Sequence, residues 1–226
     1  MVPTRADQLL ADVVGDLNRA PDQLVSACAA ALPVTGVALI AMTDSGPGAI
    51  LAATDGPARR LEELQFTYGE GPCVDSSTLG HPVLEPNLSR GGMVRWPAFT
   101  RGALDAGVQA VFAFPLQVGG IRVGVLDLYR DIAGNLDDVA LAEALAFTDA
   151  ATSLLLHLQA ATPASGPPWL NADVHSSVHQ ATGMIAVQAG VTLLEALVLL
   201  RARSFAADRS ITAVANDVVS RLLSFA

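Results

Sequence analysis

The chain has 226 residues, of which 51% are hydrophobic and 15% are charged, and its formal net charge is −9. This composition supports one or two globular cores and excludes a disordered chain, and the negative charge disfavours a general nucleic-acid binder. No run of eighteen apolar residues is free of polar interruption, and the N-terminus lacks the basic start of a signal peptide. We therefore expect a cytoplasmic protein without a membrane partner.

The first elements in chain order are helices. Leu9, Val13 and Leu17 recur at helical spacing, and Pro21 and Asp22 can start a second helix. Apolar runs over residues 36–42 and 49–54, separated by a turn, predict two strands, and a helix is expected over residues 58–65.

Farther along, residues 110–118 and 121–129 predict two strands joined by a turn at Gly119 and Gly120. A long helix over residues 136–158 follows, capped by Asn135 or Asp137. The order of elements favours an α+β sandwich with an antiparallel sheet flanked by helices over residues 1–160. A proline-rich linker over residues 161–169 comes next, because it contains small residues, three prolines and no charge.

Residues 170–226 predict a small all-α domain of three helices. Val174, Val178, Ala181 and Ile185 have the spacing of a coiled-coil seam, and Thr192 with Glu195 fits a capping box. Asp208 or Ser210 can cap the third helix. The second and third helices are expected to bury the following residues: Leu193, Ala196, Leu197, Leu200, Ser204, Ile211, Val214, Ala215, Val218 and Leu222.

Several motifs of the first region resemble those of GAF domains in actinobacterial regulators, over about residues 20–158. They are the stretches at residues 69–75, 95–99, 114–116 and 124–129, which read GEGPCVD, RWPAF, FPL and GVLDLY. The resemblance implies a sensor domain that binds a small molecule or mediates dimerisation.

The last fifty-odd residues are similar to ANTAR domains, without a gap over about residues 170–224. The matching residues are Thr182–Ile185, Gly190–Thr192, Glu195 and Ala196, Leu199–Arg201, Arg209–Ile211, and Val214 with Ala215. The resemblance implies a module that binds hairpin loops in nascent RNA and prevents terminator formation. Ser204 stands where the family usually has alanine, and Asp208 stands where it often has asparagine.

The RNA-binding candidates of this module are Arg201, Arg203, Arg209 and Gly183. All thirteen basic residues are arginines, and the guanidinium group suits phosphate binding and base stacking. Four arginines balance four acidic residues over residues 162–226, so the whole net charge of −9 lies in residues 1–161. The alternative is a solvated surface with ion pairs to Asp208 or Asp217, and for Gly183 tight helix packing.

Cys73, Trp96, Phe112, Phe114 and Tyr129 are candidates for lining a ligand pocket in the GAF domain, although such side chains also form ordinary cores. We expect no cofactor, and no catalytic motif is present. His175 and His179 share a helix face, but no third ligand is evident, and two cysteines cannot complete a structural zinc site, so no metal is expected.

The leading hypothesis is a non-enzymatic, homodimeric antitermination regulator in which the GAF domain senses a signal and the ANTAR module binds RNA. Pro163, Pro167 and Pro168 prevent one continuous helix from joining the two, so the signal must pass through domain contacts or a dimer. One alternative is a dimeric sensor or protein-interaction scaffold without RNA binding. The other is a GAF-type thiol redox enzyme that uses Cys73, with Cys28 as its partner.

Overall fold

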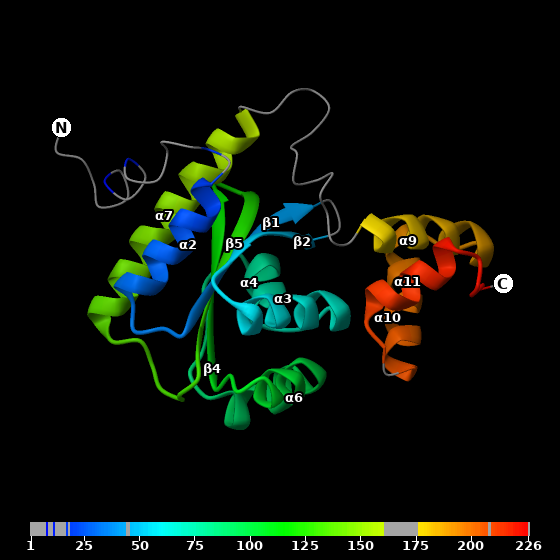
Figure 1. Cartoon of the computed structure of the whole chain (residues 1–226), viewed down its shortest axis with the longest axis horizontal. Helices are drawn as coiled ribbons and strands as arrows, with labels where there is room; N and C mark the ends of the chain where they lie inside the picture. Colours follow the sequence, from blue (N-terminus) through cyan, green and yellow to red (C-terminus); the bar gives the residue numbers. More distant parts are fainter. Residues whose placement is uncertain are drawn as a thin grey trace.

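The computed structural model describes residues 19–43, 46–160, 176–207 and 209–225, with single positions at 8, 11 and 17. Within these residues, an α+β sandwich ends at residue 160 and three helices begin at residue 176 (Figure 1). Most of the expected first helix, the linker over residues 161–169, His175 and Asp208 lie outside the described residues.

A five-stranded sheet in the order β2-β1-β5-β4-β3 forms the centre of the sandwich, and every neighbouring pair is antiparallel. The strands are β1 (Gly36–Thr43), β2 (Gly46–Ala53), β3 (Val83–Glu85), β4 (Ala110–Val118) and β5 (Ile121–Arg130). The expected antiparallel α+β fold is confirmed. The expected hairpin is β4–β5, and Gly119 adopts φ +59° in its turn, where glycine has no steric penalty.

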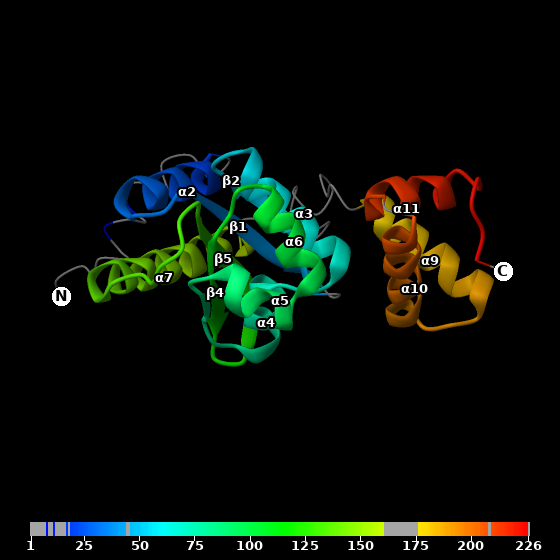
Figure 2. The ribbon, with the colours of Figure 1, turned by 90° about the horizontal axis from the view of Figure 1, so that it is seen from below.

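Helices cover both faces of this sheet (Figures 1 and 2). One face packs against α2 (Ala20–Ala31) and α7 (Asp138–Ala160), and the other against α3 (Gly56–Tyr68), α4 (Pro72–Leu79) and α6 (Pro97–Asp105). Side chains alternate along each strand. Leu126 and Leu128 of β5 therefore enter the α2–α7 core, whereas Val125 and Tyr129 enter the α3–α4–α6 core.

The end of α3 brings two helices close together through a short glycine turn. Asp55 caps the start of α3 by accepting a 2.7 Å hydrogen bond from the Ala58 amide, and Gly69 ends the helix in the left-handed conformation with φ +66°. Helix α4 begins three residues later at Pro72. Neither α4 nor α6 was expected from the sequence pattern, nor were the short turns η1 (Leu88–Gly92) and α5 (Met93–Arg95).

Helix α7 is long and apolar enough to span a membrane by length and composition alone. In the structure it is instead a core helix of the sandwich. Ala144, Phe147, Ala151 and Leu154 are buried, in one core with strands β4 and β5 and helix α2. The expected cap is confirmed at Asp137, which accepts a 2.8 Å hydrogen bond from the Ala140 amide.

The C-terminal helices α9 (Ser176–Ala189), α10 (Leu193–Ala206) and α11 (Ile211–Val219) form a small module with its own core. The expected capping box is confirmed, since the Thr192 hydroxyl accepts from the Glu195 amide and the Glu195 carboxylate accepts from the Thr192 amide. Ser210 caps α11 as expected. The buried residues are Val178, Ala181, Thr182, Ile185, Ala196, Leu197, Leu200, Ser204, Ile211, Val214, Ala215 and Val218.

Two expectations for this module are wrong. Leu193 is 63% exposed because it lies in the first turn of α10, and Leu222 is 80% exposed because α11 ends at Val219. Val178, Ala181 and Ile185 pack inside the module, so their seam-like spacing reflects helix contacts within one chain.

Candidate functional site

The motif stretches that resembled a GAF domain pack against one another. Glu70 accepts hydrogen bonds of 2.6 and 2.9 Å from the Ala98 and Phe99 amides at the start of α6. Asp75 accepts from Arg95 at 3.0 Å and from the Trp96 indole at 3.1 Å. These polar residues hold the loops around α4 and α6 in place, and they form no catalytic constellation.

The five expected pocket residues do not come together in one pocket. Phe112 and Phe114 lie in the α2–α7 core, whereas Cys73, Trp96 and Tyr129 lie on the opposite face of the sheet. All five are at most 4% exposed. Alternation along β4 separates the aromatic residues of this strand from the others, so the sheet itself excludes a shared cavity.

On the α3–α4 side, a buried polar cluster surrounds Cys73. Gln65 of α3 donates hydrogen bonds from Nε2 to Glu62 at 3.0 Å and to Asp127 of β5 at 2.9 Å. Its Oε1 accepts a 2.7 Å hydrogen bond from the Cys73 amide at the start of α4. One ligand atom from each of Glu62, Cys73 and Asp127 lies within 4.8 Å of the other two.

Burial governs the electrostatics of this cluster, since a charged group loses the solvation of water. It raises the pKa of Asp127 to about 6, against the opposing effect of the Glu62, Gln65 and Cys73 side chains. Burial, and then the nearby Asp127 carboxylate, raises the pKa of Glu62 well above its usual range. The pKa of the Cys73 thiol is also raised, by burial and then by the two carboxyl groups.

Sequence reasoning named Cys73 but missed Glu62, Gln65 and Asp127. A usable signal was present at Asp127, the one charged residue between Val123 and Tyr129 in an otherwise apolar strand. A carboxylate at the centre of a buried strand requires partners, and such a position is a candidate functional site. The spacing of Glu62 and Gln65 on a helix did not by itself reveal their orientation toward the sheet.

Cys28 is not near this cluster. It is buried in α2 on the other face of the sheet, and burial raises its pKa as well. Two buried thiols on opposite faces cannot form a disulfide without unfolding, and a raised pKa keeps a thiol in its less nucleophilic form. The two cysteines therefore do not make a redox pair in this fold.

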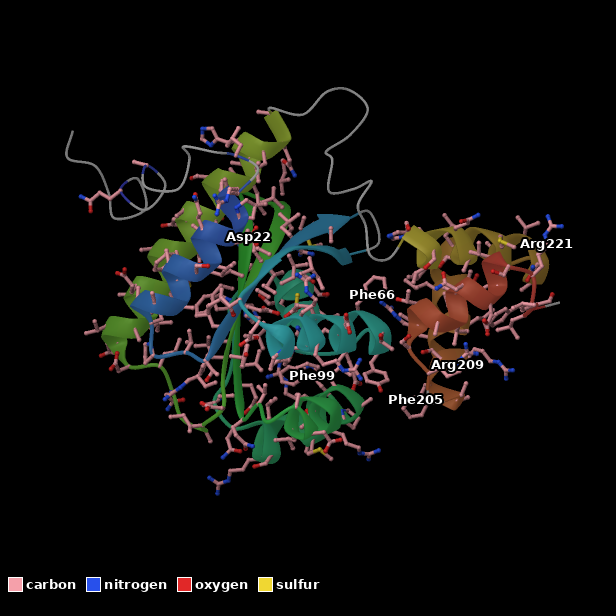
Figure 3. All side chains as sticks on the ribbon, in the orientation of Figure 1. Asp22, Phe66, Phe99, Phe205, Arg209 and Arg221 are labelled. Carbon is pink, nitrogen blue, oxygen red and sulfur yellow. The ribbon has the colours of Figure 1, made fainter. Side chains whose placement is uncertain are left out.

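Arg201, expected to face outward, instead joins the helical module to the sandwich. Its Nε and Nη2 atoms donate hydrogen bonds of 3.2 and 3.1 Å to the carbonyl oxygen of Phe66 in the last turn of α3. Its guanidinium carbon also lies 5.9 Å from the centre of the Phe66 ring, and burial lowers the pKa of Arg201. Figure 3 shows Phe66 between α3 and the module.

Aromatic contacts extend this junction. Phe66 is only 8% exposed and packs with the module's core, and Tyr68 meets Phe205 of α10 edge-on at 6.2 Å between ring centres. A Cβ atom at Gly69 would lie 2.7 Å from Arg201 Nη1, so the glycine permits the close approach of α10. Beside the junction lies a cleft of about 460 Å³, whose lining includes Arg60, Arg101, Asp105, Ser204 and Arg209.

The other candidate arginines remain at the surface of the module. Arg203 is exposed, and Arg209 pairs with Asp217 at 2.7 Å, as the alternative interpretation expected, with its side chain 46% exposed. Ser204, the first departure from the family pattern, donates from its buried hydroxyl to the Arg209 carbonyl and thereby fixes the turn between α10 and α11.

Gly183 lies on an open side of α9. A Cβ atom built at this position would meet nothing within 4 Å, so the tight-packing alternative for Gly183 is wrong. The residue lines a groove of about 620 Å³ together with Met184, Val187 and Arg221. Arg221 lies on the side of the module away from the sandwich (Figure 3).

Comparison with solved structures identifies the fold of the sandwich. The GAF domain of an Acinetobacter phosphoenolpyruvate-protein phosphotransferase aligns with a TM-score of 0.55 at 12% identity, over 71% of this chain and 95% of that domain. The corresponding domain from Coxiella burnetii gives 0.52 at 14% identity, over 71% and 98%. The reduced form of fRMsr from Staphylococcus aureus gives 0.51 at 14% identity, over 67% and 92%.

These likenesses show that the sandwich has a GAF fold. Because the identities are 12–14%, the fold is all that they show. No family model matches the sequence, and no curated protein does either.

Proposed function

We propose that the chain is a signal-responsive, non-enzymatic RNA-binding regulator of transcription antitermination. The GAF domain senses the signal, and the helical module, which resembles an ANTAR domain, binds hairpin loops in nascent RNA. The contact between Arg201 and the Phe66 carbonyl carries this proposal. A guanidinium suited to RNA phosphates or bases is held by the last turn of a sensor helix, so the docked arrangement is the inactive one.

Charge supports this interpretation. The module is electrically neutral over residues 162–226, whereas the preceding residues carry the whole net charge of −9. RNA that approaches the docked module also approaches an acidic sandwich, which repels phosphates. Release of the module exposes Arg201 on the same helix as Arg203, away from that field.

Dimerisation is part of the proposal. One neutral module with few arginines binds one hairpin weakly, and two linked modules on twin hairpins gain affinity from their high effective concentration. Side chains for such an association are present on the module: Val187, Leu193, Leu194, Val198 and Phe205 are each at least 56% exposed. Exposed apolar groups of this kind mark candidate association surfaces.

The test is binding of the whole chain to a twin-hairpin RNA and to a scrambled control at two salt concentrations. Tyr68→Ala removes the edge contact with Phe205, and Phe66→Ala removes the ring beneath Arg201. Both variants should raise the affinity for the hairpin RNA about tenfold, because each would weaken the competing docked arrangement by ~1.4 kcal/mol.

Val94→Ala is the control, since Val94 is 86% exposed on the sandwich and should leave the affinity unchanged. If neither the original chain nor the docking variants prefer the twin hairpin in a salt-dependent manner, RNA binding is rejected. The sensor or protein-interaction scaffold then takes its place. If RNA binds but both docking variants match the original chain, the docked arrangement does not inhibit binding.

A further inference from the structure

We propose that Glu62, Cys73 and Asp127 form a buried binding site for one divalent metal ion of zinc-like chemistry. The three residues come from α3, the start of α4 and the middle of β5, so the site exists only in the folded sandwich. One ligand atom from each residue lies within 4.8 Å of the other two, which places a thiol and two carboxyl groups around one point.

An unpartnered atom at this point is the second observation. Oδ2 of Asp127 accepts from Gln65, but Oδ1 accepts no hydrogen bond from any described residue, although Asp127 is only 4% exposed. Among the described residues, Thr100 Oγ1 is the one other buried side-chain atom in this condition. A buried carboxylate oxygen without a donor costs free energy, and a bound cation removes that cost.

The charge balance points the same way. No positively charged group contributes to the pKa shifts of Glu62, Cys73 or Asp127. Two carboxyl groups and a thiol therefore share a buried space with no compensating cation from the described residues. A divalent ion supplies two positive charges and favours the deprotonated form of all three ligands.

Gln65 has the role of a supporting residue around such an ion. Its Nε2 holds one oxygen of Glu62 and one of Asp127, and its Oε1 holds the Cys73 amide. Hydrogen bonds of this kind orient metal ligands. Gly71 makes room for it, because a Cβ there would lie 2.5 Å from Gln65 Oε1.

The ligand set selects the class of metal. Thiolate together with carboxylate suits Zn²⁺, Co²⁺ or Fe²⁺, whereas Mg²⁺ and Ca²⁺ prefer oxygen ligands alone. Three protein ligands also leave one coordination position for water or a signal molecule. One of its ligands, Glu62, lies one turn before Phe66 on α3, the helix that docks the module.

Cobalt titration of the chelator-treated whole chain tests the site, because a cobalt–thiolate bond produces a charge-transfer band in the near ultraviolet. We expect one Co²⁺ per chain, with a band that Cys73→Ser abolishes and that excess Zn²⁺ displaces. Cys28→Ser is the matched control, since Cys28 is a buried free thiol on the other face of the sheet, and it should retain the band.

Asp127→Asn provides a variant that keeps the thiol and an oxygen acceptor for Gln65. It should retain the fold and weaken Co²⁺ binding by tenfold or more. No charge-transfer band in the original chain, or an equal band in Cys73→Ser, overturns the proposal. Unchanged Co²⁺ affinity in Asp127→Asn also overturns it. If Cys73→Ser fails to fold, the Co²⁺ affinity of Asp127→Asn is the test of the site. A proton shared by Glu62 and Asp127 then explains the cluster.

Discussion

The contribution of a charged side chain to the stability of this protein depends on its burial and on its polar partners. Asp127 and Arg209 are both charged, but Asp127 is 4% exposed and Arg209 has a side chain that is 46% exposed and paired with Asp217. The surface ion pair adds little to stability because water screens it, whereas a buried carboxyl group without a cation destabilises the folded state. Asp127 is therefore the residue at which a substitution reports most directly on the buried cluster.

Asp127→Asn should stabilise the metal-free protein at high pH. In the fold the pKa of Asp127 is about 6, above its ordinary value of 3.8, so the folded state binds this proton more tightly. The free energy of unfolding of the original chain therefore falls as the pH rises from about 4 past about 6, by about 3 kcal/mol from this group alone. Urea unfolding with chelator at pH 4, 6 and 8 measures the difference.

The variant should show a flatter profile than the original chain, with the largest gap at pH 8 and little gap at pH 4. Glu62, whose pKa is also raised, contributes a decline of the same sign in both proteins. Parallel profiles for the two proteins would show that Asp127 is not ionised at a cost in the fold.

At the scale of elements, α3 and α9 differ in what surrounds their glycines. The glycines at the end of α3 are needed for close contacts and for left-handed backbone, whereas Gly183 lies inside α9 with open space around it. A helix-interior glycine costs about 1 kcal/mol relative to alanine, and no packing requirement explains it here.

Gly183→Ala should raise the free energy of unfolding of the module by about 0.5–1 kcal/mol, because alanine restricts the unfolded chain and fits the helix. Gly190→Ala is the matched comparison. Its Cβ would also meet nothing within 4 Å, but its φ of +65° is unfavourable for alanine, so this variant should lose stability. The denaturant midpoints of the two variants and the original chain measure these changes in stability. A loss of stability in Gly183→Ala would contradict the open helical environment of Gly183.

At the scale of the whole molecule, the junction between the sandwich and the module is narrow. It consists of the last turn of α3 against α10, with Arg201, Phe66, Tyr68 and Phe205 as its principal side chains. Hydrogen bonds from a charged donor contribute about 1.5–3 kcal/mol, so one arginine supplies much of what holds the two units together.

Arg201→Ala should therefore release the module and increase the radius of gyration measured by small-angle X-ray scattering. Arg203→Ala is the control, because Arg203 is an exposed arginine on the same helix. It should leave the radius of gyration unchanged and the free energy of unfolding within about 0.5 kcal/mol of that of the original chain. If Arg201→Ala scatters like Arg203→Ala and the original chain, the aromatic contacts alone hold the module. Because Arg201 both docks and is a candidate RNA contact, its effect on RNA binding must be compared with that of Tyr68→Ala.

Local patterns in the sequence were sufficient for most elements. The β4–β5 hairpin, the cap at Asp137 and the capping box of Thr192 and Glu195 all depend on residues within a few positions of each other. Alternation and helical periodicity therefore predicted the sandwich, the three helices and most of the module's buried face. The short α4 and β3 escaped prediction because they have little periodicity of their own.

The sites depended on contacts between residues far apart in the chain. Asp127 meets Gln65 across 62 positions, and Arg201 meets Phe66 across 135, and no local pattern encodes either pairing. The sequence by itself determined which segments fold into helices and strands and which of their faces are apolar. Only the tertiary structure decided which polar groups are enclosed together and which arginine faces a carbonyl instead of solvent, because burial and partnership arise when separate elements pack.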